Sequence, residues 1–398
     1  MNRIIKAGIK KIDSVVLACL FSISSILFLF SINDSGSWIY LFFVLYFISL
    51  MILNKDSFSI KRVNKKMLDV VLITMFMLLM VLISAVWAYN IENIIKLMVS
   101  IILAMFTYFM SKENIYWTYV CVVIINTIYA IVVCLKTDRV YNVLSGGDTN
   151  YLNMTLPLGL TLTLTLTFFV VNLFFKRRLE PISLIISIIL FTALSKFTAR
   201  GSLLFPILIA FIIASLIGTK NKVRFFVVVI VLGIIIFLAY RYFITYANAY
   251  IVNRMTRLFS ENNSEDRWGI WKTYIAFISR DNMYIVGGGA GSAIAKLGYY
   301  PHNILLQMLG ELGFLVTVSF IYICCKMFIG TIKINKRLKG MSLNREIVVF
   351  YLSVAGVMYY FLTFMKSFQV YDAYLLYIIL AMTLKINNTI TIGGEKND

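Results

Sequence analysis

Apolar runs near the length needed to cross a bilayer recur from one end of the chain to the other, separated mostly by short polar connections. Backbone groups in lipid must be satisfied within their own segment, so each run is expected to be an α-helix. The pattern therefore predicts an all-α, polytopic integral membrane protein with about twelve transmembrane helices. The expected spans are residues 15–32, 38–53, 67–87, 94–110, 116–135, 151–175, 181–197, 201–218, 225–240, 303–328, 347–365 and 373–386.

Lysine and arginine residues gather at alternate connections, before the first span and after every second one. The positive-inside rule assigns these connections, and both termini, to the cytoplasm. Most of the net charge of +19 is then a topology signal. Because the basic residues are dispersed over short loops, we expect no nucleic-acid partner. We interpret residues 1–398 as a single integral membrane domain.

Composition agrees with this class of protein. Hydrophobic residues make up 61% of the chain and charged residues only 14%, which excludes a soluble fold of this length. All five cysteines fall within expected spans, which favours buried inert thiols over a disulfide framework or a metal site. The first span could pass for a signal peptide, but no small-residue cleavage site follows it, and we expect it to be mature structure.

Two outer connections are long, residues 136–150 and 241–302. The second, the large periplasmic loop between the ninth and tenth spans, holds seven basic residues against four acidic ones, on the side that the charge rule normally depletes. Arginine offers a planar fork that matches phosphate oxygens, so Arg254, Arg257 and Arg267 are candidates for binding an anionic substrate. Alternatively, long loops escape the rule and their arginines meet anionic headgroups.

Residues 265–279 within this loop are expected to form a helix. Trp268, Trp271, Ile275 and Ile278 recur at helical spacing and predict one apolar face, with Arg267 near the start of the helix. A glycine-rich stretch follows at residues 287–291. Such a stretch permits positive φ and close approach of backbone amides to a ligand, although a flexible hinge has the same composition.

Two cations lie near the outer end of the seventh span. Lys196 and Arg200 are four residues apart, which puts them on one helical face if the helix continues. The next apolar run starts at Gly201, so rigid backbone would hold Arg200 as a clamp for phosphate. Snorkelling toward lipid headgroups is the alternative for both side chains, and for Lys196 the two interpretations are equally open.

His302 is the chain's one histidine and follows Pro301, a favoured first helical residue. We expect its imidazole in the opening turn of span 303–328, beside Asn303, and we count Asn303 and Glu311 as further candidates for substrate binding. The positive end of that helix disfavours protonation, so the neutral ring can act as a general base. The alternative is a simple cap or headgroup contact. Glu311 would lie ~13 Å deeper, where an ionisable group is usually paired or functional.

The residues favour chemistry without a metal or cofactor. One histidine, no carboxylate pair at ligand spacing and no nucleotide-binding loop occur in the sequence. Energy-requiring chemistry outside the cytoplasm needs an activated substrate. A lipid-linked diphosphate fits, because arginines would bind the leaving group while the histidine deprotonates an attacking hydroxyl.

Four segments in this order resemble the O-antigen ligase and Wzy-type polymerase superfamily. They are Thr198-Ala-Arg200-Gly-Ser, the Arg267-Trp…Trp271 helix, the 287–291 glycines, and Pro301-His302-Asn303-x7-Glu311-x-Gly313. The resemblance covers about residues 195–316. Residues 1–190 add only the number of spans and a Gly-Gly-Asp-Thr-Asn loop before the sixth span.

The resemblance implies inverting glycan transfer from an undecaprenyl-diphosphate-linked glycan at the periplasmic face of the bacterial inner membrane, without metal or nucleotide. Arg200 and Arg267 match the superfamily's diphosphate-binding arginines and His302 its proposed base, whereas Arg254 and Arg257 have no firm match. Ligases usually carry Gly, Thr or Tyr at the position of Val316, so this chain departs from their pattern.

A repeat-unit polymerase is thus the first hypothesis, with the lipid-linked glycan, membrane lipid and other polysaccharide-assembly proteins as expected partners. The alternative is an O-antigen ligase that moves finished polymer onto lipid A core. A polysaccharide or lipid transporter is the third hypothesis. Transporters, however, concentrate ionisable and helix-breaking residues at mid-membrane, and this chain has only four prolines.

Overall fold

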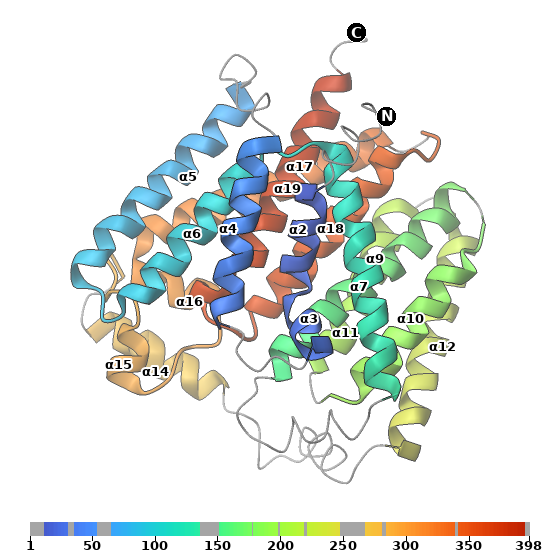
Figure 1. The fold of residues 1–398 in the computed structure, drawn as a ribbon, viewed down its shortest axis with the longest axis horizontal. Helices are drawn as coiled ribbons and strands as arrows, with labels where there is room; N and C mark the ends of the chain where they lie inside the picture. Colours follow the sequence, from blue (N-terminus) through green and yellow to red (C-terminus); the bar gives the residue numbers. More distant parts are fainter. Residues whose placement is uncertain are drawn as a thin grey trace. The chain divides into compact units, whose positions relative to one another are not determined.

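The computed structural model describes residues 12–30, 36–53, 65–135, 151–176, 178–197, 200–218, 221–246, 267–280, 284–338 and 341–394. These residues are 86% helical and contain no strand (Figure 1). The predicted all-α class is therefore confirmed.

Every predicted span coincides with a helix or a pair of consecutive helices. In chain order these are α2 (Ile12–Phe21) with α3 (Ile23–Phe30), α4 (Gly36–Leu53), α5 (Lys65–Ser84), α6 (Ile91–Thr107), α7 (Lys112–Leu135), α9 (Tyr151–Phe175), α10 (Pro181–Ser195), α11 (Arg200–Gly218), α12 (Lys222–Tyr246), α16 (Ile304–Gln307) with α17 (Phe314–Leu338), α18 (Arg345–Phe364) and α19 (Tyr374–Gly394). Six described helices are long and apolar enough to cross a membrane, or seven if a bent pair counts as one span. The chain is a multi-pass membrane protein.

The chain divides into two compact units, each built from separated stretches. Unit 1 comprises Met1–Leu53, Ser111–Ser260 and Asn335–Tyr359, and unit 2 comprises Asn54–Met110, Glu261–Ile334 and Tyr360–Asp398. His302 and Arg267 belong to unit 2, whereas Lys196 and Arg200 belong to unit 1.

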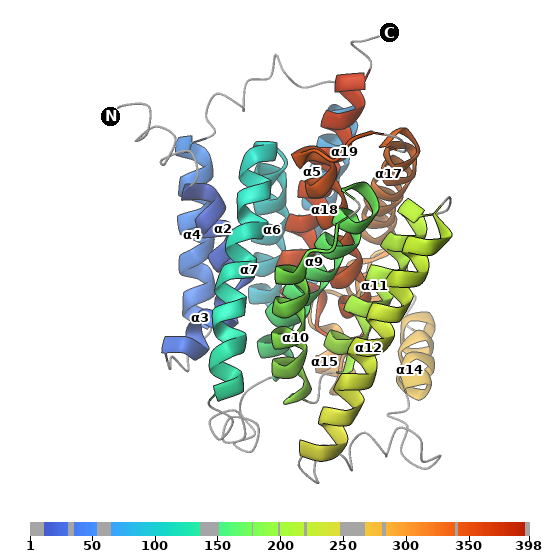
Figure 2. The same cartoon turned by 90° about the vertical axis from the view of Figure 1, so that its right-hand side faces the viewer.

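Helix α9 lies at the centre of unit 1 and packs against α7, α10 and α11 (Figure 2). Its Leu-Thr alternation gives it buried threonines on several sides. The hydroxyls of Thr161 and Thr163 donate to the carbonyls of Pro157 and Gly159, each at 2.8 Å. Because these two hydroxyls are satisfied within the helix, they add no desolvation penalty where other helices surround α9.

The first predicted span is bent. α2 and α3 meet at Ser22 with an angle of 78°. The amide nitrogen of Asn126 on α7 donates to the Ser22 and Thr161 hydroxyls, each at 3.0 Å, and its oxygen accepts from Ser25 at 2.7 Å. The expected span over residues 15–32 is therefore a pair of shorter helices, and this buried polar cluster stabilises the break between them.

Unit 2 contains α5, the short turn η3 (Ala85–Trp87), α6, most of α17, and α19, which packs against α6. Figure 1 shows α14 (Arg267–Arg280) and α15 (Ser292–Leu297) near the end of the unit where α5 and α6 are joined. Toward the other end, Lys326 of α17 and Asp69 of α5 form an ion pair at 2.9 Å. The two ends of unit 2 therefore differ in chemistry.

The boundaries of two predicted elements change. α12 continues to Tyr246, so Arg241 lies on a helix and not at the start of a loop. Span 303–328 is interrupted: α16 passes into the π-helical turn η4 (Met308–Leu312), and Gly313 then adopts φ 86° and ψ 175°, outside any helix. The long helix begins only at Phe314. Glu311 consequently precedes the spanning helix, and the expected depth of ~13 Å along one helix was wrong.

Candidate functional site around His302 and Glu311

His302 lies just before a helix and not inside it. Its φ is 51°, in the left-handed region that a non-glycine residue rarely adopts, and Asn303 after it is the N-cap of α16. The expectation that the imidazole occupies the first turn of a long helix was wrong. The ring is half-buried and lies 4.1 Å from the Tyr300 ring, centre to centre, at 45°. A strained backbone and a neighbouring aromatic ring thus fix the imidazole.

Asn303 has a definite structural role. Its side-chain oxygen accepts from the amides of Leu305 and Leu306 at 3.1 and 3.2 Å, which is an N-cap contact, and its side chain is buried. The N-cap contact therefore competes with the predicted binding of substrate for the same side-chain oxygen of Asn303. The cap instead fixes the direction in which α16 leaves His302.

Helix α14 confirms the predicted helix over 265–279 within two residues, but its buried face is rotated from the expected one. Tyr274 and Ile278 are buried and pack with Ala293 of α15, whereas Trp268 is 72% exposed and Ile275 50% exposed. The prediction assigned all four apolar residues to one face because it did not count Tyr274 among the residues that become buried.

Trp271 ties α14 to the histidine segment. Its indole N–H donates to the carbonyl oxygen of Pro301 at 2.9 Å, one residue before His302. Arg267 is the first residue of α14, four positions before Trp271. One helical turn separates the two backbones, ~5.4 Å along the axis and on the same face. The side chain of Arg267 lies outside the described residues, but its backbone position is next to the face that contacts Pro301.

Glu311 is fully buried and is the centre of a hydrogen-bond network. Its carboxylate accepts from the backbone amides of Gly291 and Ala293 at 3.1 and 3.3 Å, and from the side-chain amide of Gln307 at 3.4 Å. The hydroxyl of Tyr371 donates a further, short hydrogen bond to it. The partners that the sequence could not identify are therefore neutral donors, and among the described residues no basic side chain bonds to Glu311.

Gln307 extends this network to a third segment. Its side-chain oxygen accepts from the amide of Val370 at 2.9 Å. Val370 and Tyr371 belong to the short turn η5 (Val370–Asp372) between α18 and α19. Through Gln307 and Glu311, the segment α16–η4 that follows His302 is hydrogen-bonded to both α15 and η5. The network therefore connects segments that are far apart in the chain.

Burial controls the protonation of the two acids in this network. It raises the pKa of Glu311 above its usual value, and the hydrogen bonds from Tyr371 and the other donors oppose this only in part. Burial and the nearby Glu311 raise the pKa of Tyr371 well above its usual value. Tyr371 therefore keeps its proton and acts as the donor.

The glycine stretch packs closely against neighbouring backbone. Gly287 and Gly289 have φ of 86° and 89°, and a Cβ at Gly289 would lie 2.2 Å from the Trp87 carbonyl oxygen. The amides of Gly288 and Gly289 donate to the carbonyls of Gly310 and Glu311 at 2.7 and 3.0 Å. These amides are used inside the protein, so the expected ligand contact gives way to a packing role.

Two predicted residues of unit 1, Lys196 and Arg200, do not share one helix. α10 ends at Ser195, Lys196 begins a turn, and Arg200 starts α11, so the expected shared helical face does not exist. The Lys196 ammonium is buried and donates to the Cys134 and Val133 carbonyls at 2.9 and 3.4 Å, which caps the last turn of α7. This contact gives Lys196 a structural role. The Arg200 side chain, Arg254 and Arg257 lie outside the described residues.

Sequence reasoning missed Tyr371 and the role of Gln307, because both act through contacts between distant segments. It also missed two buried hydroxyls, of Tyr274 and Ser292, which have no hydrogen-bond partner among the described residues. Tyr274 is close enough to Glu311 for the carboxylate to raise the pKa of its phenol further, after burial itself. A signal was present in the sequence: Tyr274 falls between Trp271 and Ile278 at helical spacing.

Comparison with known proteins does not assign a family. No protein-family model matches the chain, and no curated protein matches it. The resemblance to O-antigen ligases and polymerases therefore rests on the residues themselves, and the functional assignment that follows is a proposal.

Proposed function

We propose that the protein is a metal-independent glycosyltransferase that uses a lipid-diphosphate donor and extends a polysaccharide by repeat units. One observation carries the proposal. The segment that holds the half-buried His302 is bonded through the Pro301 carbonyl to α14, and Arg267 begins that helix. A general base and a phosphate-binding group are thus supplied by two segments joined by one hydrogen bond.

The chemistry follows from these residue types. The His302 imidazole takes the proton of an acceptor hydroxyl, whose oxygen attacks the anomeric carbon of the donor glycan. The bond from that carbon to the undecaprenyl diphosphate oxygen breaks, with inversion, and the guanidinium group of Arg267 stabilises the departing diphosphate. General base catalysis typically raises the reaction rate ~10²–10⁴-fold.

A topology with about twelve spans and both termini in the cytoplasm of the bacterial inner membrane fits this chemistry. In unit 2, α5 begins at Lys65, and Lys333 lies near the end of the part of α17 that belongs to this unit. The charge rule assigns that end to the cytoplasm. His302 belongs to the opposite end, where the backbone of Tyr89 and Asn90, between α5 and α6, bonds to Ala290. The proposed reaction is therefore periplasmic, on an already activated donor.

The test is complementation of a deletion strain, with polymer length read on a polysaccharide gel. His302→Gly keeps a residue that tolerates φ of 51° and removes the ring, whereas His302→Ala removes the ring and keeps the strain. Both variants should lose chain extension at wild-type protein level. Normal polymer length in the glycine variant would overturn the proposal.

The same strain separates the two glycan-transfer hypotheses. Loss of a polymerase leaves lipopolysaccharide with a single repeat, whereas loss of a ligase leaves core without repeats. We propose the polymerase on the sequence pattern, including Val316, and a core-only phenotype would assign the protein as a ligase instead.

The bent α2–α3 pair is the feature that a transporter would use, because substrates of transporters bind at broken helices near mid-membrane. The polar groups at this break, of Ser22, Ser25, Asn126 and Thr161, bond to one another. They serve the packing of unit 1, so we do not propose transport.

A further inference from the structure

Helix α16, which follows His302 after the cap residue, is a single turn and is too short to hold its own direction. Contacts at its two ends must therefore fix it. At the start, the Asn303 side chain caps the turn. At the end, the backbone amide of Gln307 donates to the Asn303 carbonyl at 2.9 Å. Gln307 thus closes the turn that begins beside the imidazole.

The side chain of Gln307 is fully buried and uses both of its polar atoms. Its oxygen accepts from the backbone amide of Val370 at 2.9 Å, and its nitrogen donates to the Glu311 carboxylate at 3.4 Å. An apolar side chain of the same size would leave the Val370 amide without this acceptor, which buried amides rarely tolerate. One side chain therefore links the end of α16 to a buried acid and to the turn η5.

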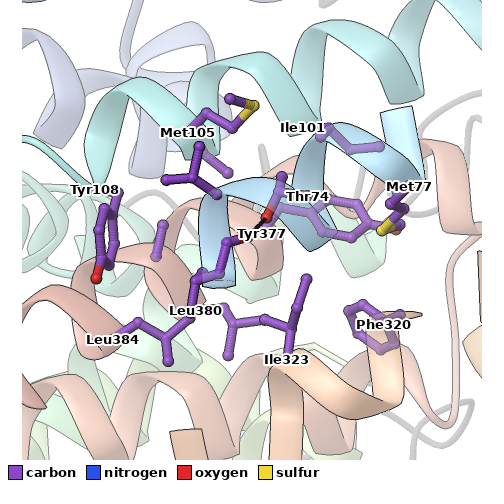
Figure 3. A pocket seen from close by; sticks show the side chains of 14 residues that line it. Thr74, Met77, Ile101, Met105, Tyr108, Phe320, Ile323, Tyr377, Leu380 and Leu384 are labelled. Atoms are coloured by element: carbon purple, nitrogen blue, oxygen red, sulfur yellow. Dashed lines mark hydrogen bonds between the residues drawn. The ribbon is translucent and has the colours of Figure 1, made fainter. Parts of the chain in front are cut away.

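The turn η5 is itself firmly held, because it leads directly into α19 and both elements pack against α6. The Tyr377 ring of α19 meets the Phe320 ring of α17 edge-on, with 5.8 Å between their centres and 77° between their planes. Figure 3 shows both rings among the apolar side chains between these helices. Gln307 precedes α17 as Val370 precedes α19, so their hydrogen bond joins the leading ends of two helices that contact each other.

Strained backbone lies near both ends of this bridge. Among the described residues, two other than glycine have positive φ, His302 at 51° and Phe368 at 71°. His302 lies five positions before Gln307, and Phe368 lies two positions before Val370. Such a conformation costs free energy and persists only where the surrounding contacts fix it, which is typical of functional sites. Helix α14 fixes the segment before His302, and Gln307 fixes the segment after it.

We propose that Gln307 is a positioning residue for His302, an inference that rests on the proposed role of His302 as general base. By bridging the Glu311 carboxylate and the Val370 amide, Gln307 holds α16 in the direction that presents the imidazole to the acceptor hydroxyl. Because it is fully buried, it acts through the backbone of the capped turn and not by contact with substrate. Loss of the bridge should release the strain at His302 and displace its ring.

The chain's one histidine provides a direct readout of this displacement. Full-length protein without a histidine tag, labelled with isotopes only at histidine, gives one set of imidazole NMR signals in detergent. The Tyr300 ring lies 4.1 Å from the imidazole, centre to centre, so its ring current shifts these signals according to the placement of the two rings. Gln307→Met keeps the side-chain size and removes both hydrogen bonds. It should shift or broaden the signals and lower chain extension about a hundredfold at matched protein level.

Two further variants make the test specific. Val370→Pro removes only the amide donor, at the first position of η5, where proline is tolerated and the extended Gln369 precedes it. It should reproduce the spectral change of Gln307→Met, and it decides if that variant does not fold. Asn387→Leu is the matched control. It removes a buried amide of α19 that donates to the Met327 carbonyl at 3.1 Å, and should leave the His302 signals unchanged.

Unchanged His302 signals in Gln307→Met and Val370→Pro would overturn the proposal. Equal spectral changes in Asn387→Leu would overturn it as well, because they would show a general loss of packing. Displaced signals with normal polymer length would support positioning by Gln307 and overturn the role of His302 as base, so the two proposals fail by different results.

Discussion

The indole N–H of Trp271 and the carbonyl oxygen of Pro301 are 2.9 Å apart and form a direct hydrogen bond between α14 and the residue before His302. Thirty positions of sequence separate the two partners, and a stretch with four glycines lies between them. The bond fixes the position of α14 relative to the His302 imidazole. Any role for Arg267 beside His302 therefore depends on this bond.

Removal of this bond should weaken the proposed site. Trp271→Phe keeps an aromatic ring and loses the donor, which should cost about 1 kcal/mol of stability. Displacement of α14 by as little as ~1 Å should lower polymer formation by up to about a hundredfold. Trp268→Phe changes an exposed ring on the same helix and should leave both quantities unchanged. Thermal unfolding in detergent and polymer gels check these values, and identical behaviour of the two variants would contradict the bond's role.

Arg267 should need its planar fork. Arg267→Lys keeps the charge but cannot make two parallel bonds to a diphosphate, so activity should fall about a hundredfold. Arg280→Lys, at the exposed last turn of the same helix, should retain wild-type activity. Polymer yield at matched expression measures both. Full activity of Arg267→Lys would reduce Arg267 to a headgroup contact.

The close approach of Gly289 to Trp87 predicts a steric cost beyond backbone strain. In Gly289→Ala a methyl group meets the Trp87 carbonyl at 2.2 Å with φ of 89°, and we expect a loss of about 2–4 kcal/mol. Gly298→Ala is the control, because its φ is 78° and nothing lies within 4 Å of the added methyl group. Strain alone should cost that variant about 1 kcal/mol. Equal melting temperatures for the two variants would remove the steric argument.

Glu311 and Tyr371 should be strongly coupled. Glu311→Gln presents an amide group to donors that need an acceptor, and should cost about 3 kcal/mol. Tyr371→Phe removes one donor and should cost about 1–2 kcal/mol. In a double-mutant cycle of unfolding free energies, the coupling should reach about 1–3 kcal/mol. A coupling near zero would show that the short bond between these side chains contributes nothing.

The raised pKa of Glu311 also predicts a pH dependence with a definite sign. A carboxyl whose pKa is higher in the folded than in the unfolded state binds more protons when folded, so stability is greatest below the unfolded pKa of about 4.3. Stability should fall as the pH rises from there through the folded pKa. Glu311→Gln lacks this contribution. The difference in melting temperature between the wild type and Glu311→Gln should therefore be smallest at the alkaline end of the range pH 4–8.

Part of the candidate site could be read from residue types alone. His302, Glu311 and the helix that starts at Arg267 stand out because ionisable residues are rare in so apolar a chain. Their partners could not be predicted in this way. Tyr371 is sixty positions from Glu311, and nothing in its local sequence separates it from the other tyrosines. The contact of Lys196 could not be predicted for the same reason, since its acceptors are carbonyls at the end of α7.

The sequence by itself determined that this is an all-α, multi-pass membrane protein, because each apolar run must satisfy its own backbone in lipid and therefore folds as a helix wherever it packs. It also determined where the helices lie to within a few residues. Only the tertiary structure decided where helices break, at Ser22 and Gly313, and which donors surround Glu311. Those features depend on side chains from distant segments, whose hydrogen bonds replace the backbone hydrogen bonds that are lost where a helix breaks. The periodicity of a single segment cannot predict these contacts.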